Sequence, residues 1–204
     1  MAHEGYPYII IPIVLALVLL ALGFWPIALP FLLLAAFMAY FFRDPQRNAP
    51  SDVNVIVSPA DGRVTRVRQL SPEDAASPTV ISIFLSPLDV HINRAPIAGT
   101  ITDVTYQHGK FLMATDEDSS LVNEQNALTI RGANVTVVCK QIAGILARRI
   151  ICWKQAGDAV AIGERFGLIK FSSRTDLIVP PGIEITVREG ARVFGGETII
   201  GRIL

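Results

Sequence analysis

Three short segments of the 204-residue chain carry polar side chains that packing alone does not require: SPADG, SPLDVHINRAP and FSSRTD. They supply an aspartate, a histidine and a pair of serines, namely Asp61, His91, Ser172 and Ser173. An orienting carboxylate, an imidazole that titrates near neutrality and a hydroxyl are the groups that together activate serine as a nucleophile. If the three segments converge in the fold, they predict nucleophilic chemistry at a serine.

Each candidate also has an ordinary structural interpretation. Asp61 precedes a glycine, which is a common turn pair, and the two serines could end a strand by bonding to the local backbone. Asp89 and Arg94 could form a local ion pair of little energetic weight. The chain has three histidines and one lies in the N-terminal tail, so histidine-dependent chemistry in the rest of the chain must use His91 or His108. The residue types alone therefore leave both interpretations open.

Composition narrows the class of protein. The 18 Lys and Arg residues balance the 18 Asp and Glu residues, which removes the positive field that nucleic-acid binders use, so we expect no nucleic-acid partner. The two cysteines, Cys139 and Cys152, lack the close spacing of a zinc site and the density of a disulfide scaffold. We expect both to be small core residues, and we predict no metal site.

Residues 6–42 contain no charged side chain, and this run is nearly twice the roughly 20 apolar residues that one spanning helix needs. It is interrupted at GFWP, where Gly23 and Pro26 break a helix, which predicts two apolar helices in a hairpin. The N-terminus, MAHEGYP, lacks the basic start of a cleaved signal peptide. Arg43 and Arg47 follow the run and favour the cytoplasmic side. We therefore predict that residues 1–43 anchor the protein in the cell membrane, with the rest of the chain in the cytoplasm.

From residue 51 onward, short runs rich in Val and Ile alternate with Gly and Pro, as in VIVSPADGRVTRV and GIEITVREGARV. Such runs predict a mostly β domain over residues 44–204. The stretches 156–167 and 189–201 share glycines and a valine at equal spacing and are similar to hairpins of barrel-sandwich folds. Common turn chemistry would produce the same repeat. We expect a compact β-sandwich or barrel-sandwich-like domain that follows a hydrophobic helical hairpin.

Six segments occur in the order found in the phosphatidylserine decarboxylases: FFRDPQR, SPADGRV, SPLDVHINRAPIAG, YQHGKFLMA, NEQNALTI and RFGLIKFSSRTDLIVP. From about Phe41 to the C-terminus, the chain resembles the short, membrane-anchored bacterial and archaeal branch of that family, which includes archaetidylserine decarboxylase-like proteins. Longer bacterial members have a second histidine three residues after the first. Arg94 occupies that position here, so His91 alone corresponds to a family histidine.

The resemblance implies a self-processing enzyme. Members of the family are made as inactive proenzymes, which cut their own chain at a Gly-Ser bond and convert the serine into an N-terminal pyruvoyl group. Ser173 matches that serine, so cleavage between 172 and 173 would give a larger chain, 1–172, and a smaller chain, 173–204. The resemblance assigns His91 as the base for the Ser173 hydroxyl and Asp61 as the carboxylate that orients it. The implied reaction converts phosphatidylserine into phosphatidylethanolamine and carbon dioxide.

A carbonyl group that the enzyme makes for itself suits this chemistry. Loss of carbon dioxide from an amino acid leaves a carbanion, and a carbonyl that condenses with the amine acts as the electron sink. No amino-acid side chain supplies such a carbonyl, so an enzyme must recruit a cofactor or make one. The resemblance makes Ser173 the precursor of a pyruvoyl cofactor and His91 the candidate that returns a proton to carbon.

The chain departs from the family pattern at Ser172, where the family has glycine. Glycine permits backbone angles that a side chain resists. Ser172 could therefore slow cleavage, be a tolerated natural variant, or be an engineered change that keeps the proenzyme intact. The Arg-Thr-Asp triplet that follows still favours Ser173 as the cleavage serine. The alternative function is a non-catalytic, membrane-tethered β domain that binds anionic lipid or a protein partner, and Ser172 favours that alternative.

Other properties of the chain stay open at this level. Ester-linked and ether-linked serine lipids present the same head group. Lys110, Arg94 and Lys170 are candidates for binding its phosphate, and each also has an ordinary structural interpretation. Exposed strand edges and a shared membrane plane would allow a homodimer.

Overall fold

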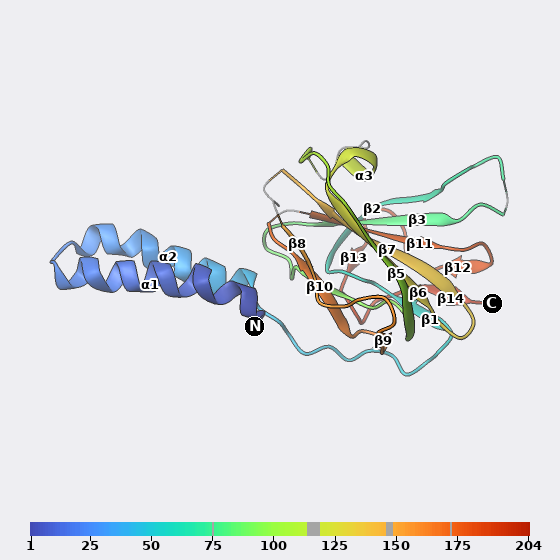
Figure 1. Ribbon diagram of the computed structural model, residues 1–204, viewed down its shortest axis with the longest axis horizontal. Coiled ribbons are helices and arrows are strands. Elements are labelled where there is room, and N and C mark those ends of the chain that lie inside the picture. Colours follow the sequence, from blue (N-terminus) through green and yellow to red (C-terminus); the bar gives the residue numbers. More distant parts are fainter. Residues whose placement is uncertain (75, 114–118, 146–148, 172) are drawn as a thin grey trace. The chain divides into compact units, whose positions relative to one another are not determined.

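The computed structural model describes residues 1–74, 76–113, 119–145, 149–171 and 173–204. Ser172, on one side of the predicted cleavage bond, lies outside the described residues. The chain divides into two compact units, Met1–Gln46 and Arg47–Leu204. Figure 1 shows the helices of the first unit and the strands of the second.

The first unit is a pair of apolar helices that follow a short 3-10 turn. The turn η1 spans His3–Gly5, and the helices are α1, Tyr6–Ala21, and α2, Trp25–Phe41. Gly23 lies between them with a φ of 82°, a left-handed conformation that glycine adopts without steric cost. The predicted hairpin and its break at GFWP are confirmed, and α2 continues through Pro30.

Small and large apolar side chains of this helix pair differ in exposure. Ala16, Ala28 and Ala35 are buried, whereas large side chains such as Leu17 and Leu33 are exposed. This pattern is typical of membrane helices, which pack through small residues and turn large apolar side chains to lipid. The stretch His3–Ala21 has 19 residues and a mean hydropathy of 2.0, so by length and composition it can cross a membrane.

The regular elements of the second unit are almost all strands, and the predicted mostly β class is confirmed, with 38% of the described residues in strands and 21% in helices. Its one short helix among the described residues is α3, Ser119–Val122. The strands are β1 Val55–Val57, β2 Gly62–Gln69, β3 Thr79–Leu85, β4 Ile92–Arg94, β5 Gly99–Gln107, β6 Gln125–Arg131, β7 Thr136–Ala143, β8 Ile150–Cys152, β9 Ala159–Val160, β10 Arg165–Ile169, β11 Ser173–Val179, β12 Ile183–Ile185, β13 Arg192–Val193 and β14 Ile199–Ile203.

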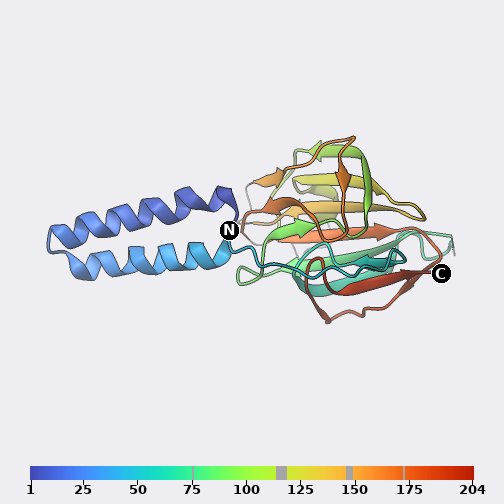
Figure 2. The same ribbon diagram turned by 90° about the horizontal axis from the view of Figure 1, so that it is seen from below.

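These strands form three sheets. The largest has the order β13-β2-β3-β11-β7-β6-β5-β9 and curls into a half-barrel. The smaller sheets have the orders β1-β14-β12 and β4-β10-β8. In Figure 2, β1 in cyan lies beside β14 in red. Residues 173–204 thus contribute β11 between β3 and β7, β13 beside β2, and β14 beside β1, so the predicted smaller chain is interleaved with the larger one.

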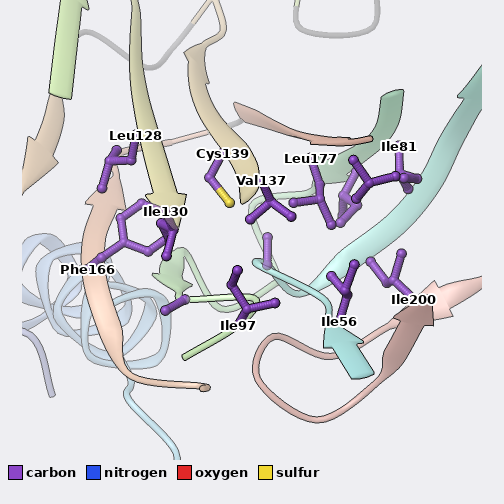
Figure 3. Packing of buried hydrophobic residues seen from close by; sticks show 14 of the residues in the cluster. Ile56, Ile81, Ile97, Leu128, Ile130, Val137, Cys139, Phe166, Leu177 and Ile200 are labelled. Atoms are coloured by element: carbon purple, nitrogen blue, oxygen red, sulfur yellow. The ribbon is translucent and has the colours of Figure 1, made fainter. Parts of the chain in front are cut away.

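One hydrophobic core joins the three sheets (Figure 3). Ile56 of β1, Phe166 of β10 and Leu177 of β11 are completely buried in the same cluster. Cys139 of β7 is also completely buried there, and burial raises the pKa of its thiol. Cys152 is partly buried and packs against the cluster. Both cysteines therefore act as packing residues, Cys139 inside the core and Cys152 at its margin.

The two repeated stretches of the sequence have matching turn conformations. Gly163 and Gly196 occupy equivalent positions in the repeat and have φ values of 75° and 79°. They also approach each other closely, because a Cβ atom added to Gly196 would lie 3.2 Å from the Gly163 Cα atom. A side chain at Gly196 would therefore be both crowded and conformationally strained. The structure explains why glycine stands at these positions, and both a duplicated unit and common turn chemistry remain compatible with it.

Candidate active site

Ser173 is the first residue of β11, within the large sheet. Its backbone pairs with Leu85 of β3 and with Ala143 of β7, and its side chain is completely buried. The hydroxyl oxygen Oγ has no hydrogen-bond partner among the described residues. Leaving a buried hydroxyl unbonded costs about 1–3 kcal/mol. The fold therefore holds a serine hydroxyl away from water without using it for structure.

The chain passes from one sheet to another just before Ser173. β10 ends at Ile169 in a small sheet, and β11 begins at Ser173 in the large one. Phe171, between the two strands, has a φ of 60° and is the one non-glycine residue of the described ranges with a positive φ. A side chain in such a conformation costs on the order of 1–3 kcal/mol. The predicted cleavage bond, between residues 172 and 173, thus lies one residue beyond a strained residue.

His91 is completely buried, and its ring nitrogen Nδ1 lies 3.0 Å from the backbone carbonyl oxygen of Asp89. A carbonyl oxygen only accepts hydrogen bonds, so in the neutral ring Nδ1 carries the hydrogen and Nε2 carries the lone pair. This tautomer suits Nε2 to act as a general base. The N–H of Ile169 donates to the His91 carbonyl at 3.2 Å, which connects the His91 loop to the strand end that leads to Ser173.

Further bonds fix the loop that carries His91. The backbone N–H of Ser86 donates to Oδ2 of Asp89 at 2.8 Å, and Arg192 of β13 pairs with Oδ1 of Asp89. Arg94 instead donates to the carbonyl of Gly163 at 3.0 Å. The ion-pair partner of Asp89 is therefore Arg192 and not Arg94, because the sheet brings β13 to this loop.

Asp61 lies just before β2, and both of its carboxylate oxygens accept hydrogen bonds. Oδ1 accepts from the backbone N–H of Gly195 at 2.8 Å, and Oδ2 accepts from Nη2 of Arg47 at 2.6 Å. Burial raises the pKa of the Asp61 carboxyl, while the Gly195 N–H and Arg47 act in the opposite direction, and the nearby charge of Asp89 raises it. Neither of these two hydrogen bonds involves His91, and the Asp89 carbonyl supplies a contact that orients the imidazole. The role of Asp61 as the orienting carboxylate stays a prediction.

A chain of buried polar side chains reaches the side of β11 that carries Ser173. Thr175 accepts a hydrogen bond from Nδ2 of Asn93 at 2.9 Å, and Oδ1 of Asn93 accepts one from Nε2 of Gln141 at 2.9 Å. Oε1 of Gln141 in turn accepts from Nδ2 of Asn126 at 3.0 Å. Residues two apart on a strand face the same side, so Thr175 shares the side of Ser173. The network anchors this side of β11 to β4, β7 and β6.

The segment SPLDVHINRAP contains Asn93, but sequence reasoning missed Gln141, Asn126 and the contacts of Arg47. The available signal for Gln141 was the alternation in VVCKQIAG: Val137 and Cys139 are buried in β7, and Gln141 continues the same inward side. A polar residue at an inward strand position requires a buried partner. The pairing of Arg47 with Asp61 had no comparable local signal.

The three candidates for phosphate binding have different environments. Arg94 is buried and bonded to a backbone carbonyl, Lys170 is buried, and Lys110 is exposed. Among the residues that the structure describes, no group of three or more His, Cys, Asp or Glu side chains is placed to hold a metal ion. The assignment of a phosphate ligand stays a prediction.

Comparisons with known proteins agree with the motifs and extend over nearly the whole chain. The sequence profile described as phosphatidylserine decarboxylase matches residues 34–201. A phosphatidylserine decarboxylase proenzyme of Solibacter usitatus is 54% identical over 177 residues, which are 87% of this chain and 84% of that relative. Proteins of the same name from Geotalea uraniireducens and Burkholderia ambifaria are 43% and 41% identical over 204 residues, which are 98% and 99% of this chain and 95% of each relative.

Proposed function

Because the chain belongs to the phosphatidylserine decarboxylase family, we propose that it is a proenzyme that cleaves itself between Ser172 and Ser173 and then converts phosphatidylserine into phosphatidylethanolamine and carbon dioxide. The observation that carries the proposal is the Ser173 hydroxyl. It is buried, it has no hydrogen-bond partner among the described residues, and it closely follows the strained residue Phe171. These are the properties of a serine held for attack on its own backbone.

In the self-cleavage step, Oγ of Ser173 attacks the carbonyl carbon of Ser172, and its proton passes to Nε2 of His91. An ester forms as the carbon–nitrogen bond breaks, and the freed nitrogen of Ser173 takes up the proton. Removal of the Ser173 Cα proton then breaks the Cβ–Oγ bond, which releases the carboxylate of Ser172 and leaves dehydroalanine. Addition of water and loss of ammonia convert that residue into an N-terminal pyruvoyl group.

Asp89 and Asp61 would have separate parts in this step. The carbonyl of Asp89 fixes the tautomer in which Nε2 of His91 is the base. An ionised Asp61 supplies negative charge that stabilises the imidazolium formed when His91 takes the proton. Each oxygen of the Asp61 carboxylate has a second lone pair, so its bonds to Arg47 and Gly195 leave capacity for a further donor.

The residues around Ser173 fit a pyruvoyl group. Once formed, its carbonyl condenses with the amine of the lipid and draws electrons from the bond that releases carbon dioxide. Leu85 and Ala143, which flank Ser173 on the neighbouring strands, are completely buried. They would exclude water from the reacting carbon, and His91 would return a proton to it.

Cleavage would not release the smaller chain. Residues 173–204 supply β11 to the centre of the large sheet, β13 to its edge and β14 to the sheet that contains β1. We expect chains 1–172 and 173–204 to remain together as one enzyme after cleavage.

The helical pair would bring this enzyme to its substrate. Its exposed large apolar side chains and buried alanines favour insertion into lipid, and Arg43 and Arg47 favour a catalytic domain on the cytoplasmic side. The substrate class is a serine phospholipid, whether ester-linked or ether-linked. Association of two copies as a homodimer stays a prediction.

Mass spectrometry of the purified full chain in detergent tests the proposal, with Ser173→Ala as the comparison. The unaltered protein should give chains 1–172 and 173–204, a ketone that an amine and cyanoborohydride trap, and carbon dioxide from phosphatidylserine vesicles. Ser173→Ala should give one chain and no carbon dioxide, and equal release from both proteins would contradict the proposal. An unaltered chain that stays intact but binds anionic vesicles would support the second function, a non-catalytic lipid-binding domain, which Ser172 in place of glycine favours.

A further inference from the structure

Arg47 makes two ion pairs with acidic residues that lie far from it in sequence. Its Nη2 bonds Oδ2 of Asp61 at 2.6 Å, and its Nη1 bonds Oε2 of Glu197 at 2.9 Å. The side chains of Arg47 and Asp61 are 10% and 7% exposed, whereas that of Glu197 is 33% exposed. One guanidinium therefore joins a buried carboxylate to a partly exposed one.

The surrounding backbone completes this arrangement. The N–H of Gly195 donates to the second oxygen of Asp61 at 2.8 Å, and the N–H of Asn48 donates to the second oxygen of Glu197 at 3.0 Å. All four carboxylate oxygens are thus bonded. The contacts join three segments: the residues that directly follow the helical pair in sequence, the turn before β2, and the turn between β13 and β14.

The buried carboxylate depends on its donors to remain ionised. Burial raises the pKa of Asp61, and the Gly195 N–H and Arg47 oppose that effect. Without the guanidinium, the carboxylate would keep a single backbone donor and would still face the charge of Asp89. Loss of an adjacent arginine removes an effect that commonly amounts to about 1–3 pKa units.

We propose that Arg47 is a positioning residue for self-cleavage, which holds the Asp61 carboxylate in place and ionised for its part in the step that His91 carries out. This inference rests on the proposed function, because it assigns Arg47 a part in the step at Ser173. It adds to that function a residue that acts through the carboxylate of Asp61. The segment after the helical pair thereby contributes to the chemistry of the β unit.

Several charged groups face this site and set its response to pH. Arg47 and Asp89 face Asp61, Arg192 pairs with Asp89, Glu197 shares Arg47, and the charge of Arg94 acts on Glu197. Removal of Arg47 takes one positive charge from this group. That loss favours protonation of Asp61, because Arg47 lowers the pKa of its carboxyl group, so the pH dependence of cleavage shifts to higher pH.

The test follows the rate of self-cleavage of the full chain in detergent between pH 5 and 9 for the unaltered protein, Arg47→Gln, Arg47→Lys and the matched control Glu197→Gln. Cleavage requires ionised Asp61 and neutral His91, so the rate falls as pH falls. Arg47→Gln should move this acidic limb to higher pH by as much as about 1–3 units. Arg47→Lys keeps the charge but not the planar fork, so its shift should be smaller. Glu197→Gln removes a negative charge, so any shift should be to lower pH.

Thermal unfolding of the same variants in a Ser173→Ala background separates positioning from a purely structural role. If the acidic limb of the cleavage rate lies at the same pH in Arg47→Gln and in the unaltered protein, the inference is overturned and the proposed function is left intact. Equal slowing in Arg47→Gln and Glu197→Gln, with equal loss of thermal stability and no limb shift, would overturn it as well. An unaltered protein that is not cleaved at any pH would instead overturn the proposed function, and this inference with it.

Discussion

Two buried arginine–aspartate pairs of similar length occur in different regions of the β unit. On β11, Arg174 bonds both oxygens of Asp176 through Nε and Nη2, at 2.6 and 2.8 Å. In the candidate site, Arg47 donates from Nη2 to Asp61 and from Nη1 to Glu197. The first pair is local, since its partners lie two residues apart on one strand, and Nη1 of Arg174 also donates to Oγ of Ser119 at 3.4 Å. The second is shared among distant segments.

These two pairs show that burial of an ion pair does not by itself indicate a functional site. The Arg174–Asp176 pair satisfies a guanidinium and a carboxylate on the side of β11 opposite to Ser173, where a buried charge without a partner would be costly. The Arg47–Asp61 pair contains the aspartate proposed to act with His91, whose ring is held in the tautomer of a base. Variants in the two regions should therefore separate stability from chemistry.

The largest expected difference in self-cleavage is between substitutions at two buried serines. Ser173 and Ser82 are both completely buried, and the Oγ of each has no hydrogen-bond partner among the described residues. Ser82 pairs with Asp176 in the sheet and so belongs to the other region. Ser173→Ala should abolish self-cleavage, whereas Ser82→Ala should leave it unchanged, as measured by denaturing gel electrophoresis over time.

Neither substitution should lower stability appreciably, because each removes a hydroxyl that makes no bond among the described residues. Chemical unfolding of the full chain in detergent provides that control. Loss of cleavage in both variants would contradict this prediction. It would show that cleavage depends on any buried, unbonded hydroxyl and not on the position of Ser173 after Phe171.

The next contrast is between the two aspartates. Asp176→Asn should lower the free energy of unfolding by about 3–5 kcal/mol, because it removes the buried carboxylate that accepts two hydrogen bonds from Arg174. Asp61→Asn should cost less stability, since Arg47 retains Glu197, but it should slow cleavage. The slowing should be less than the roughly 10⁴-fold loss seen when a triad aspartate that fixes the tautomer is removed, because the Asp89 carbonyl keeps that role.

Urea unfolding in a Ser173→Ala background and cleavage assays in the unaltered background measure the two effects separately. The double variant Arg174→Met, Asp176→Leu is the control, and it should recover much of the stability that Asp176→Asn loses. A larger stability loss for Asp61→Asn than for Asp176→Asn would reverse the distinction between the regions.

A smaller effect is expected from Thr175→Val on the Ser173 side of β11. The substitution removes the acceptor of Asn93 Nδ2 and leaves a buried amide N–H with one bond fewer. We expect a loss of about 1–3 kcal/mol in the free energy of unfolding and slower cleavage, because the network from Asn93 to Gln141 holds this side of the strand. Asn126→Asp is a more distant comparison at the far end of the network, and it should change cleavage less than Thr175→Val.

The sequence predicts the parts of this protein that depend on local pattern. The uncharged run over residues 6–42 and its break at GFWP predict the helical pair, and the Val-rich and Ile-rich runs predict the β unit. The ordered polar segments single out Asp61, His91 and Ser173, although their convergence on one catalytic site stays a prediction. Local pattern also contains a signal for Gln141, a polar residue on the inward side of its strand, which sequence reasoning missed.

The pairs that organise the site depend on topology and could not be predicted in this way. Arg47 and Glu197 are separated by 150 positions, and Asp89 and Arg192 by 103. Nothing in the residues near Asp89 distinguishes Arg192 from Arg94, which is much closer in sequence. Only the curl of the sheet, which brings β13 to the loop before His91, decides between the two arginines.

The smallest expected effect is a difference in the sign of pH dependence between the two carboxylates that share Arg47. Burial raises the folded-state pKa of Asp61, so the folded chain binds this proton more tightly than the unfolded chain. Its contribution to stability should therefore fall as pH rises from its ordinary value of about 3.9 toward the raised value, with a slope no steeper than about 1.4 kcal/mol per pH unit. The Asn48 N–H and Arg47 lower the pKa of Glu197, so its contribution should be present above about pH 4.3 and be lost as pH falls. Unfolding measured from pH 3 to 7 for Ser173→Ala, with and without Asp61→Asn or Glu197→Gln, should give difference curves of opposite slope, and parallel curves would show that the two carboxylates sense Arg47 in the same way.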